Sequence, residues 1–105
     1  MVNQGDIILL SFDPTIGHEQ AKSRPALVLS NDFFNKNTQL AIMCPISHAK
    51  PFPMHIELPS GLKTTGYVLC EHIRSMDIDA RGYKVLEKVD ADFLHKIIKI
   101  CKMSL

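Results

Sequence analysis

The chain has 105 residues, of which 46% are hydrophobic and 22% are charged, and its formal net charge is +1. This length fits a single domain over residues 1–105, and the composition excludes wholesale disorder. The near-neutral charge excludes a protein that coats nucleic acid without specificity. Any contact with RNA must therefore come from a few cations directed at one or two phosphates.

The sequence offers no segment for a membrane or for export. No apolar run approaches the roughly 18–20 residues that a membrane helix needs. The first six residues, Met1–Asp6, lack the basic stretch and small-residue cleavage site of a signal peptide. We therefore expect a cytoplasmic protein with no membrane partner.

Cysteine and histidine spacing gives little support for a metal or cofactor. Cys44, Cys70 and Cys101 are odd in number and widely spaced, which favours buried free thiols. The five histidines show no metal-binding spacing. The nearest candidate, Cys70-Glu71-His72, would bring its cysteine and histidine to one face only in a strand. We expect no metal and no cofactor.

The first two-thirds of the chain reads as short strands. Apolar or alternating runs predict strands over Asp6–Phe12, Pro25–Ser30, Leu40–Pro45, His55–Leu58 and Tyr67–Cys70. Pro25 would take the first position of its strand, where a missing donor is tolerated. Short strands separated by turn signals favour a compact barrel or twisted sheet over alternating βαβ units.

The C-terminal segment predicts an amphipathic helix. Asp90 is a good N-cap, and Val89 can pack on Leu94 as a hydrophobic staple. One apolar stripe contains Leu94, Ile97, Ile98, Cys101 and Leu105. The lysines on the other side, Lys96, Lys99 and Lys102, are interpreted as a solvated surface.

Three polar loops are candidates for function. The connection over Asp13–Arg24 is far longer than a hairpin needs, and long loops on small rigid folds often carry function. Two further loops, Ser47–Pro53 and Pro59–Thr65, are interpreted as possible neighbours of the first. They contain His48, Phe52 and Thr65, which we take as candidate substrate contacts.

The first loop contains the types of group that RNA cleavage without a metal would require. A base must accept the proton of the ribose 2′-hydroxyl, and a cation and a donor must stabilise the phosphorane. His18 and Glu19 could supply the base or a proton donor, and Arg24 could supply the cation. Gln20 and Lys22 lie between them. An exposed Glu19–Arg24 ion pair of little energetic value is the alternative interpretation. Arg24 precedes a proline, so its backbone is restricted to an extended conformation.

These residues resemble the MazF/PemK toxin family, and the resemblance runs through nearly the whole chain in order. The most specific part is Gly17-His18-Glu19-Gln20 followed by Arg24-Pro25. The other matching strings are Gly5-Asp6-Ile7, Phe12-Asp13-Pro14-Thr15, Ala26-Leu27-Val28-Leu29-Ser30, Phe34-Asn35, Cys44-Pro45-Ile46-Ser47, Thr64-Thr65-Gly66, Cys70-Glu71-His72-Ile73-Arg74-Ser75-Met76-Asp77 and Ala80-Arg81-Gly82.

The resemblance implies a mainly β fold: an SH3-like, partly open β-barrel of short strands with a C-terminal α-helix, assembled as a homodimer. It implies an mRNA interferase that cuts single-stranded RNA selectively, leaving a 2′,3′-cyclic phosphate and a 5′-hydroxyl. A cognate antitoxin with a flexible acidic tail would neutralise it. Family functional positions fall on Glu19, Arg24, Ser47, His18, Glu71 and His72.

Two departures from the family pattern affect the expected chemistry. The PemK branch has an arginine two positions before the acidic residue, where this chain has Leu69. Without that arginine, the cationic role in catalysis is expected to fall on Arg24. Ser47 stands where threonine is usual; it keeps the hydroxyl but loses the methyl group that restricts the rotamer.

The residue chemistry then suggests distinct roles. A guanidinium is always protonated, so Arg24 suits a phosphate clamp better than a base. Ser47 would donate a second hydrogen bond, Glu19 would be the base, and His18 an alternative base or the acid. Unpaired bases would stack on Phe52, Met54 and Tyr67, although core packing explains those side chains equally well.

Two other functions remain open at this point. The same barrel resembles CcdB-type toxins, which bind a protein target, and an inert homologue would keep only antitoxin binding. Digestion of a long RNA with EDTA present, followed by end-group analysis, distinguishes the three.

Overall fold

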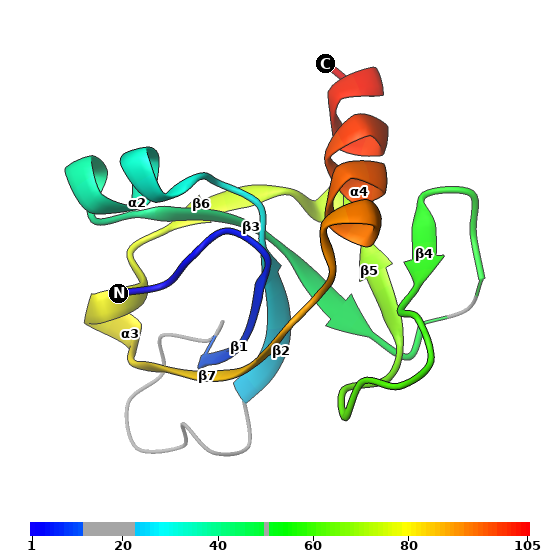
Figure 1. Cartoon of the computed structure of the whole chain (residues 1–105), viewed down its shortest axis with the longest axis horizontal. Coiled ribbons are helices and arrows are strands. Elements are labelled where there is room, and N and C mark those ends of the chain that lie inside the picture. The colour runs from blue at the N-terminus through cyan, green and yellow to red at the C-terminus, as the bar shows by residue number, and fades with distance from the viewer. Residues whose placement is uncertain (12–22, 50) are drawn as a thin grey trace.

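The computed structural model describes residues 1–11, 23–49 and 51–105. Its elements in chain order are β1 (Asp6–Ser11), β2 (Ser23–Val28), α2 (Asp32–Thr38), β3 (Ala41–Ser47), β4 (His55–Glu57), β5 (Tyr67–Leu69), the 3₁₀ turn η1 (Cys70–His72), β6 (Arg74–Met76), α3 (Ile78–Arg81), β7 (Tyr83–Lys88) and α4 (Ala91–Met103). Figure 1 shows a curved sheet with α4 standing against it near β5.

The strands form one antiparallel sheet that does not close. The sheet has seven strands in the order β4-β5-β3-β2-β1-β7, and β6 pairs with β3 off this path. Strand β3 is the centre, because its first half pairs with β6 and its last two residues pair with β5. This arrangement confirms the expected partly open, mainly β fold.

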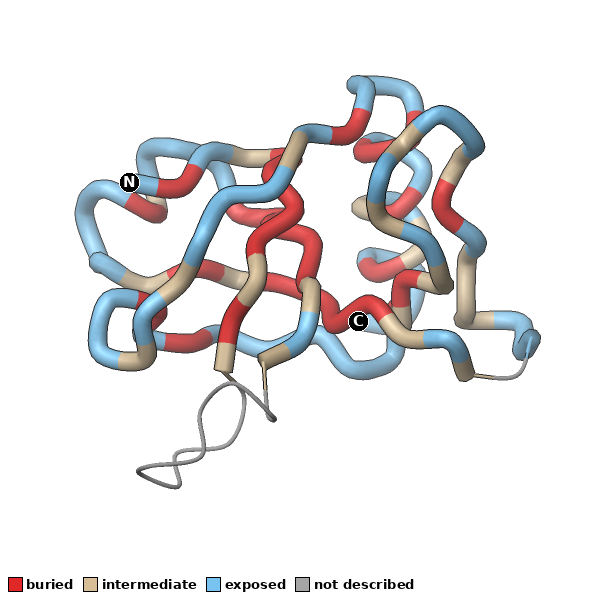
Figure 2. The backbone as a smooth tube through the Cα atoms, turned by 90° about the horizontal axis from the view of Figure 1, so that it is seen from below, coloured by how far each residue is buried: buried red, intermediate tan, exposed pale blue. Residues whose placement is uncertain are grey.

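Both faces of the central strands are buried. Ile7, Leu27 and Ile46 point into a cluster that also contains Leu94 and Ile97 of α4. Their neighbours in the sequence alternate to the other face and fill a second cluster inside the curl of the sheet, which contains Ile8, Leu10, Ala26, Val28, Ala41 and Met43. In Figure 2 the backbone segments coloured as buried accordingly gather in the interior of the molecule. Burial on both faces explains the continuous apolar runs in the sequence.

Helix α4 begins and packs as the sequence predicts, but it ends sooner. Asp90 is the N-cap, and its side chain accepts a hydrogen bond of 2.8 Å from the backbone N–H of Phe93. Val89 and Leu94 lie in the same cluster, as expected for a hydrophobic staple. Leu105, placed on the apolar stripe from the sequence, is 94% exposed because the helix stops at Met103.

The predicted strands are confirmed with shifted ends. Pro25 is the third residue of β2 and not the first. A proline is tolerated there because the ladder between β2 and β3 starts only at Ala26. The sequence patterns do not predict helices α2 and α3 or strands β6 and β7. No described helix is long and apolar enough to cross a membrane, and the three cysteines are buried and free, as predicted.

Candidate functional site

The candidate site starts where β2 and β3 run past their shared ladder. The ladder pairs Ala26 with Pro45. Arg24 comes two residues before Ala26 in β2, and Ser47 comes two residues after Pro45 in β3. Because the strands are antiparallel, both lie beyond the same end of the ladder. Side chains alternate along a strand and neighbouring strands lie about 4.8 Å apart, so these two residues belong to the same end and the same face of the sheet. A cation and a hydroxyl therefore both lie just beyond this end of the β2–β3 ladder.

Arg24 lies in strand β2 and not in the long loop predicted from the sequence. It pairs with Leu10 across β1 and is exposed. Its side chain makes no hydrogen bond or ion pair with another described residue, which leaves its guanidinium open to a ligand. The other first-loop candidates, His18, Glu19, Gln20 and Lys22, lie outside the described residues.

A row of side chains extends the site across the sheet. Ser47 pairs with Tyr67 of β5, and Tyr67 pairs with Glu57 of β4. Directly paired residues in an antiparallel sheet point to the same side. That side faces away from α4, since the alternate residues Ile46, Val68 and Ile56 pack in or against the cluster that holds the helix.

The second and third loops meet beside Ser47. His48 and Thr65 are joined by a hydrogen bond of 2.9 Å between Nε2 and Oγ1. Gly66 makes this approach possible: its φ is +124°, and a Cβ there would lie 2.8 Å from the carbonyl oxygen of Ser47. The structure therefore brings together two residues that the sequence proposed separately.

Glu87 of β7 fixes the same loop from the other side. Its carboxylate accepts hydrogen bonds from the backbone N–H of Lys63 at 3.0 Å and from both the N–H and the hydroxyl of Thr64 at 2.6 Å. These bonds lower the pKa of Glu87, led by the one from the Thr64 side chain. No local signal in the sequence marks Glu87 as a site residue, because its hydrogen-bond partners lie on a loop distant in the chain.

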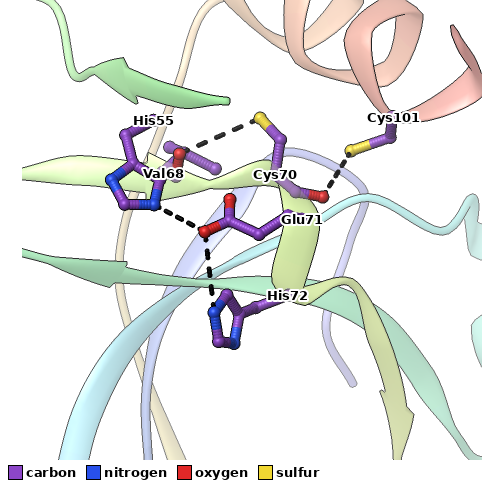
Figure 3. A network of polar contacts seen from close by, with 6 residues as sticks. All are labelled: His55, Val68, Cys70, Glu71, His72 and Cys101. Carbon is purple, nitrogen blue, oxygen red and sulfur yellow. Dashed lines mark hydrogen bonds and ion pairs between the residues drawn. The ribbon is translucent and has the colours of Figure 1, made fainter. Parts of the chain in front are cut away.

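A polar network at the end of β5 contains one more residue that the sequence missed. His55 of β4 and Glu71 are 2.5 Å apart between Nε2 and Oε2, and Nε2 of His72 lies 3.6 Å from the same oxygen (Figure 3). Partial burial works against ionisation of Glu71, but the His55 hydrogen bond and the two imidazoles outweigh it and lower its pKa. The polar–apolar alternation of His55–Leu58 was the available signal for His55.

The proposed stacking residues do not share one location. Phe52 is 55% exposed, with its ring centroid 5.0 Å from that of His55. Tyr67 lies beside Ser47 on the open face. Met54 instead packs against the cluster under α4, so core packing accounts for it.

The Cys70-Glu71-His72 segment does not form a chelating face. It is a 3₁₀ turn, with Cys70 buried and His72 exposed. Across residues 1–11, 23–49 and 51–105, no group of three or more histidine, cysteine, aspartate or glutamate side chains could hold a metal ion. The described face offers a cation, a hydroxyl, imidazoles, the exposed ring of Phe52 and the half-buried ring of Tyr67, a set suited to an anionic, aromatic ligand.

A family model described as "PemK-like, MazF-like toxin of type II toxin-antitoxin system" matches residues 3–104. The endoribonuclease PemK of Escherichia coli is 35% identical over 102 residues, which cover 92% of this chain and 77% of that protein. The endoribonuclease toxin MazF of Escherichia coli strain K12 is 38% identical over 81 residues, covering 76% and 72%.

Solved structures agree with the sequence comparison. MazF (Form-I) from Deinococcus radiodurans superimposes with a TM-score of 0.85 at 36% identity, covering 98% of this chain and 94% of that one. MazF in the MazE-MazF complex (Form-II) of the same organism gives a TM-score of 0.84 at 32% identity, covering 98% and 93%. The open sheet, its terminal helix and its polar face thus define a small toxin-like domain. The chain belongs to the PemK-like, MazF-like toxin family of type II toxin-antitoxin systems.

Proposed function

We propose that this protein is a metal-independent endoribonuclease toxin that cuts single-stranded mRNA at selected sequences and leaves 2′,3′-cyclic phosphate and 5′-hydroxyl ends. The class of enzyme follows from the family and from relatives named as endoribonucleases. The observation that carries the chemistry is the placement of Arg24 and Ser47 on adjacent strands, at one end and on one face of the sheet.

The cleavage step needs no cofactor. The ribose 2′-oxygen attacks phosphorus, the bond from phosphorus to the 5′-oxygen breaks, and the 5′-oxygen takes a proton. Arg24 clamps two equatorial phosphate oxygens with its planar guanidinium, and the hydroxyl of Ser47 donates a further hydrogen bond. Glu19 takes the proton from the 2′-hydroxyl, and His18 is the alternative base or the acid.

Substrate contacts surround this pair. Tyr67 and Phe52 offer rings for unpaired bases, and stacking holds single strands with little dependence on sequence. His48 and Thr65, tied to each other beside Ser47, contribute polar contacts. Gln20 and Lys22 complete the proposed set, together with Glu71 and His72. The guanidinium of Arg24 supplies a local positive charge, as the near-neutral chain requires.

We further propose that the protein acts in the cytoplasm as a homodimer and is neutralised by a cognate antitoxin with a flexible acidic tail. Complexes of MazE with MazF among the structural neighbours support the antitoxin partnership. An acidic tail suits a face that presents Arg24, because it mimics the charge of the RNA backbone.

Arg24→Ala tests the proposal. We expect cleavage of a long RNA, measured with EDTA present, to fall by about 100-fold or more, because an electrostatic stabiliser of the transition state is lost. Light scattering should show the same dimer for the variant as for the unchanged protein. Arg24→Lys keeps the charge without the two-pronged geometry, so its activity should lie between the two.

End-group analysis of the products supplies the remaining outcomes. Cyclic phosphate and 5′-hydroxyl ends are expected from the unchanged protein. Full activity of Arg24→Ala would overturn the mechanism, and intact RNA after incubation with the unchanged protein would favour an inert homologue or a protein-binding toxin.

A further inference from the structure

Glu71 is a carboxylate that the structure holds in one place. It follows Cys70, which is 1% exposed and donates its backbone N–H to the carbonyl oxygen of Met54 at 3.0 Å. The thiol of Cys70 contacts the carbonyl oxygen of Val68 (Figure 3). The backbone beneath Glu71 is therefore anchored in the core while its side chain projects from the end of β5.

The side chain of Glu71 is fixed as well. Its Oε2 is shared by His55, whose side chain is only 13% exposed, and by His72, whose side chain is 51% exposed. No hydrogen bond or ion pair joins Oε1 to another described side chain, and the Glu71 side chain keeps 32% of its surface exposed. One carboxylate oxygen is thus used for positioning and the other remains available as an acceptor.

An exposed aromatic ring packs on the histidine that holds this acceptor. The ring of Phe52 lies against that of His55 at an interplanar angle of 52° and is 55% exposed. His55 therefore contacts both the ring and the carboxylate. An exposed ring beside a fixed hydrogen-bonding group is the combination by which proteins recognise one unpaired base.

We propose that Glu71, positioned by His55 beside the exposed ring of Phe52, is a specificity-determining acceptor for one unpaired base that carries an exocyclic amino group. The inference rests on the proposed ribonuclease function and deepens it. Adenine, cytosine and guanine each present an amino group to an acceptor. The single N–H donor of uracil lies between two carbonyl oxygens, which a carboxylate repels.

Two other roles fit Glu71 less well. A carboxylate placed against a phosphate would repel it. A general base works best when its pKa lies near the working pH, whereas the two imidazoles lower the pKa of Glu71. A carboxylate that stays ionised is a good acceptor for base N–H groups.

The test uses the full-length protein and one long RNA with EDTA present, and it maps every cut end by sequencing. We expect the cut sites of the unchanged protein to exclude uracil at one position. Glu71→Gln should admit uracil there, reducing the discrimination by about 10-fold, because the amide can donate to a uracil carbonyl. His55→Ala should relax the same position, since the carboxylate loses its support.

Two variants separate specificity from general damage. Phe52→Leu should raise KM without changing the preferred base, since stacking is tolerant of sequence. Asp92→Asn removes an exposed carboxylate on α4, behind the other face of the sheet, and should leave the cut sites unchanged.

Binding gives a second measurement that does not need turnover. Two oligonucleotides would carry the mapped cut sequence with a 2′-deoxy sugar at the cleaved position. One would have cytosine, and the other uracil, at the position from which the unchanged protein excludes uracil. The unchanged protein should bind the cytosine form about 10-fold more tightly, and Glu71→Gln should bind both alike. Equal binding by the unchanged protein, or unaltered cut sites in Glu71→Gln, would overturn the inference while leaving the ribonuclease proposal intact. Failure of the unchanged protein to cut RNA would instead overturn the ribonuclease proposal, and the inference with it.

Discussion

Arg24 takes its position from the residue that follows it. A residue before proline avoids the helical region, and Arg24 is found in the extended backbone of β2. Ser47 ends β3 at the place where Gly66 allows the third loop to approach its carbonyl oxygen. At the scale of single residues, the candidate site thus depends on one proline and one glycine as much as on its polar groups.

The ionised state of Glu71 has a measurable consequence for stability. The folded protein holds the proton of this carboxyl less tightly than the unfolded chain, whose pKa is about 4.5. Its contribution is therefore complete above that value and is lost as the pH falls through the lower folded value. We expect the difference in unfolding free energy between the unchanged protein and Glu71→Gln to shrink as the pH is lowered from above 4.5 to below it.

Urea denaturation at a series of pH values measures this difference. His55 and His72 face the carboxylate and are present in both proteins, so the comparison isolates the loss of the carboxylate beside them. A difference that does not change across this range would show that Glu71 gains nothing from the two imidazoles.

At the scale of elements, short strands are positioned by side chains from distant parts of the chain. The three residues of β4 and the three of β5 form a small ladder that extends β3 beyond its pairing with β2. The loop between β4 and β5 is tied to β7 by Glu87 and to the end of β3 by the bond from Thr65 to His48. The polar face therefore depends on elements at both ends of the sheet.

Glu87→Ala tests this connection. We expect faster hydrogen exchange at the backbone amides of Lys63 and Thr64, because both lose a carboxylate acceptor, while amides of the central strands keep their protection. Exchange measured by NMR or mass spectrometry reports the effect. Unchanged exchange at these two amides would mean that the carboxylate does not hold the loop.

At the scale of the whole molecule, the sheet carries an apolar cluster on each side and each cluster has its own cover. Helix α4 closes one side with Leu94, Ile97 and Cys101. The curl of the sheet, together with Val2 and Ile78, closes the other. This arrangement leaves one end of the sheet, beyond Ala26 and Pro45, free to present polar groups.

Ile97→Ala measures the contribution of α4. Ile97 is fully buried, so the substitution should lower the free energy of unfolding by about 2–5 kcal/mol through lost burial and the cavity that remains. Lys96→Ala, on the exposed side of the same helix, should change it by less than about 0.5 kcal/mol. Equal effects of the two substitutions in urea denaturation would contradict the packing described for α4.

The sequence by itself determined those elements whose signals are local. The apolar runs of β1, β2 and β3 and the capped, amphipathic pattern of α4 need no distant partner to be recognised. It also supplied the family strings, and with them Arg24 and Ser47. It did not reveal α2, whose seven residues include weak helix formers and are supported by Asn31 as N-cap and by a buried hydrogen bond between Ser30 and Asn35.

Only the tertiary structure decided which polar groups meet. His55 and Glu71 are 16 residues apart and become neighbours because β4 pairs with β5 in a particular register. Arg24 and Ser47 share a face because β2 and β3 align at Ala26 and Pro45. A register is set by packing summed over the whole sheet, and a shift of one residue would turn each side chain to the opposite face. Local sequence patterns identify the chemical types of these groups, but they do not show which groups lie close together in the folded protein.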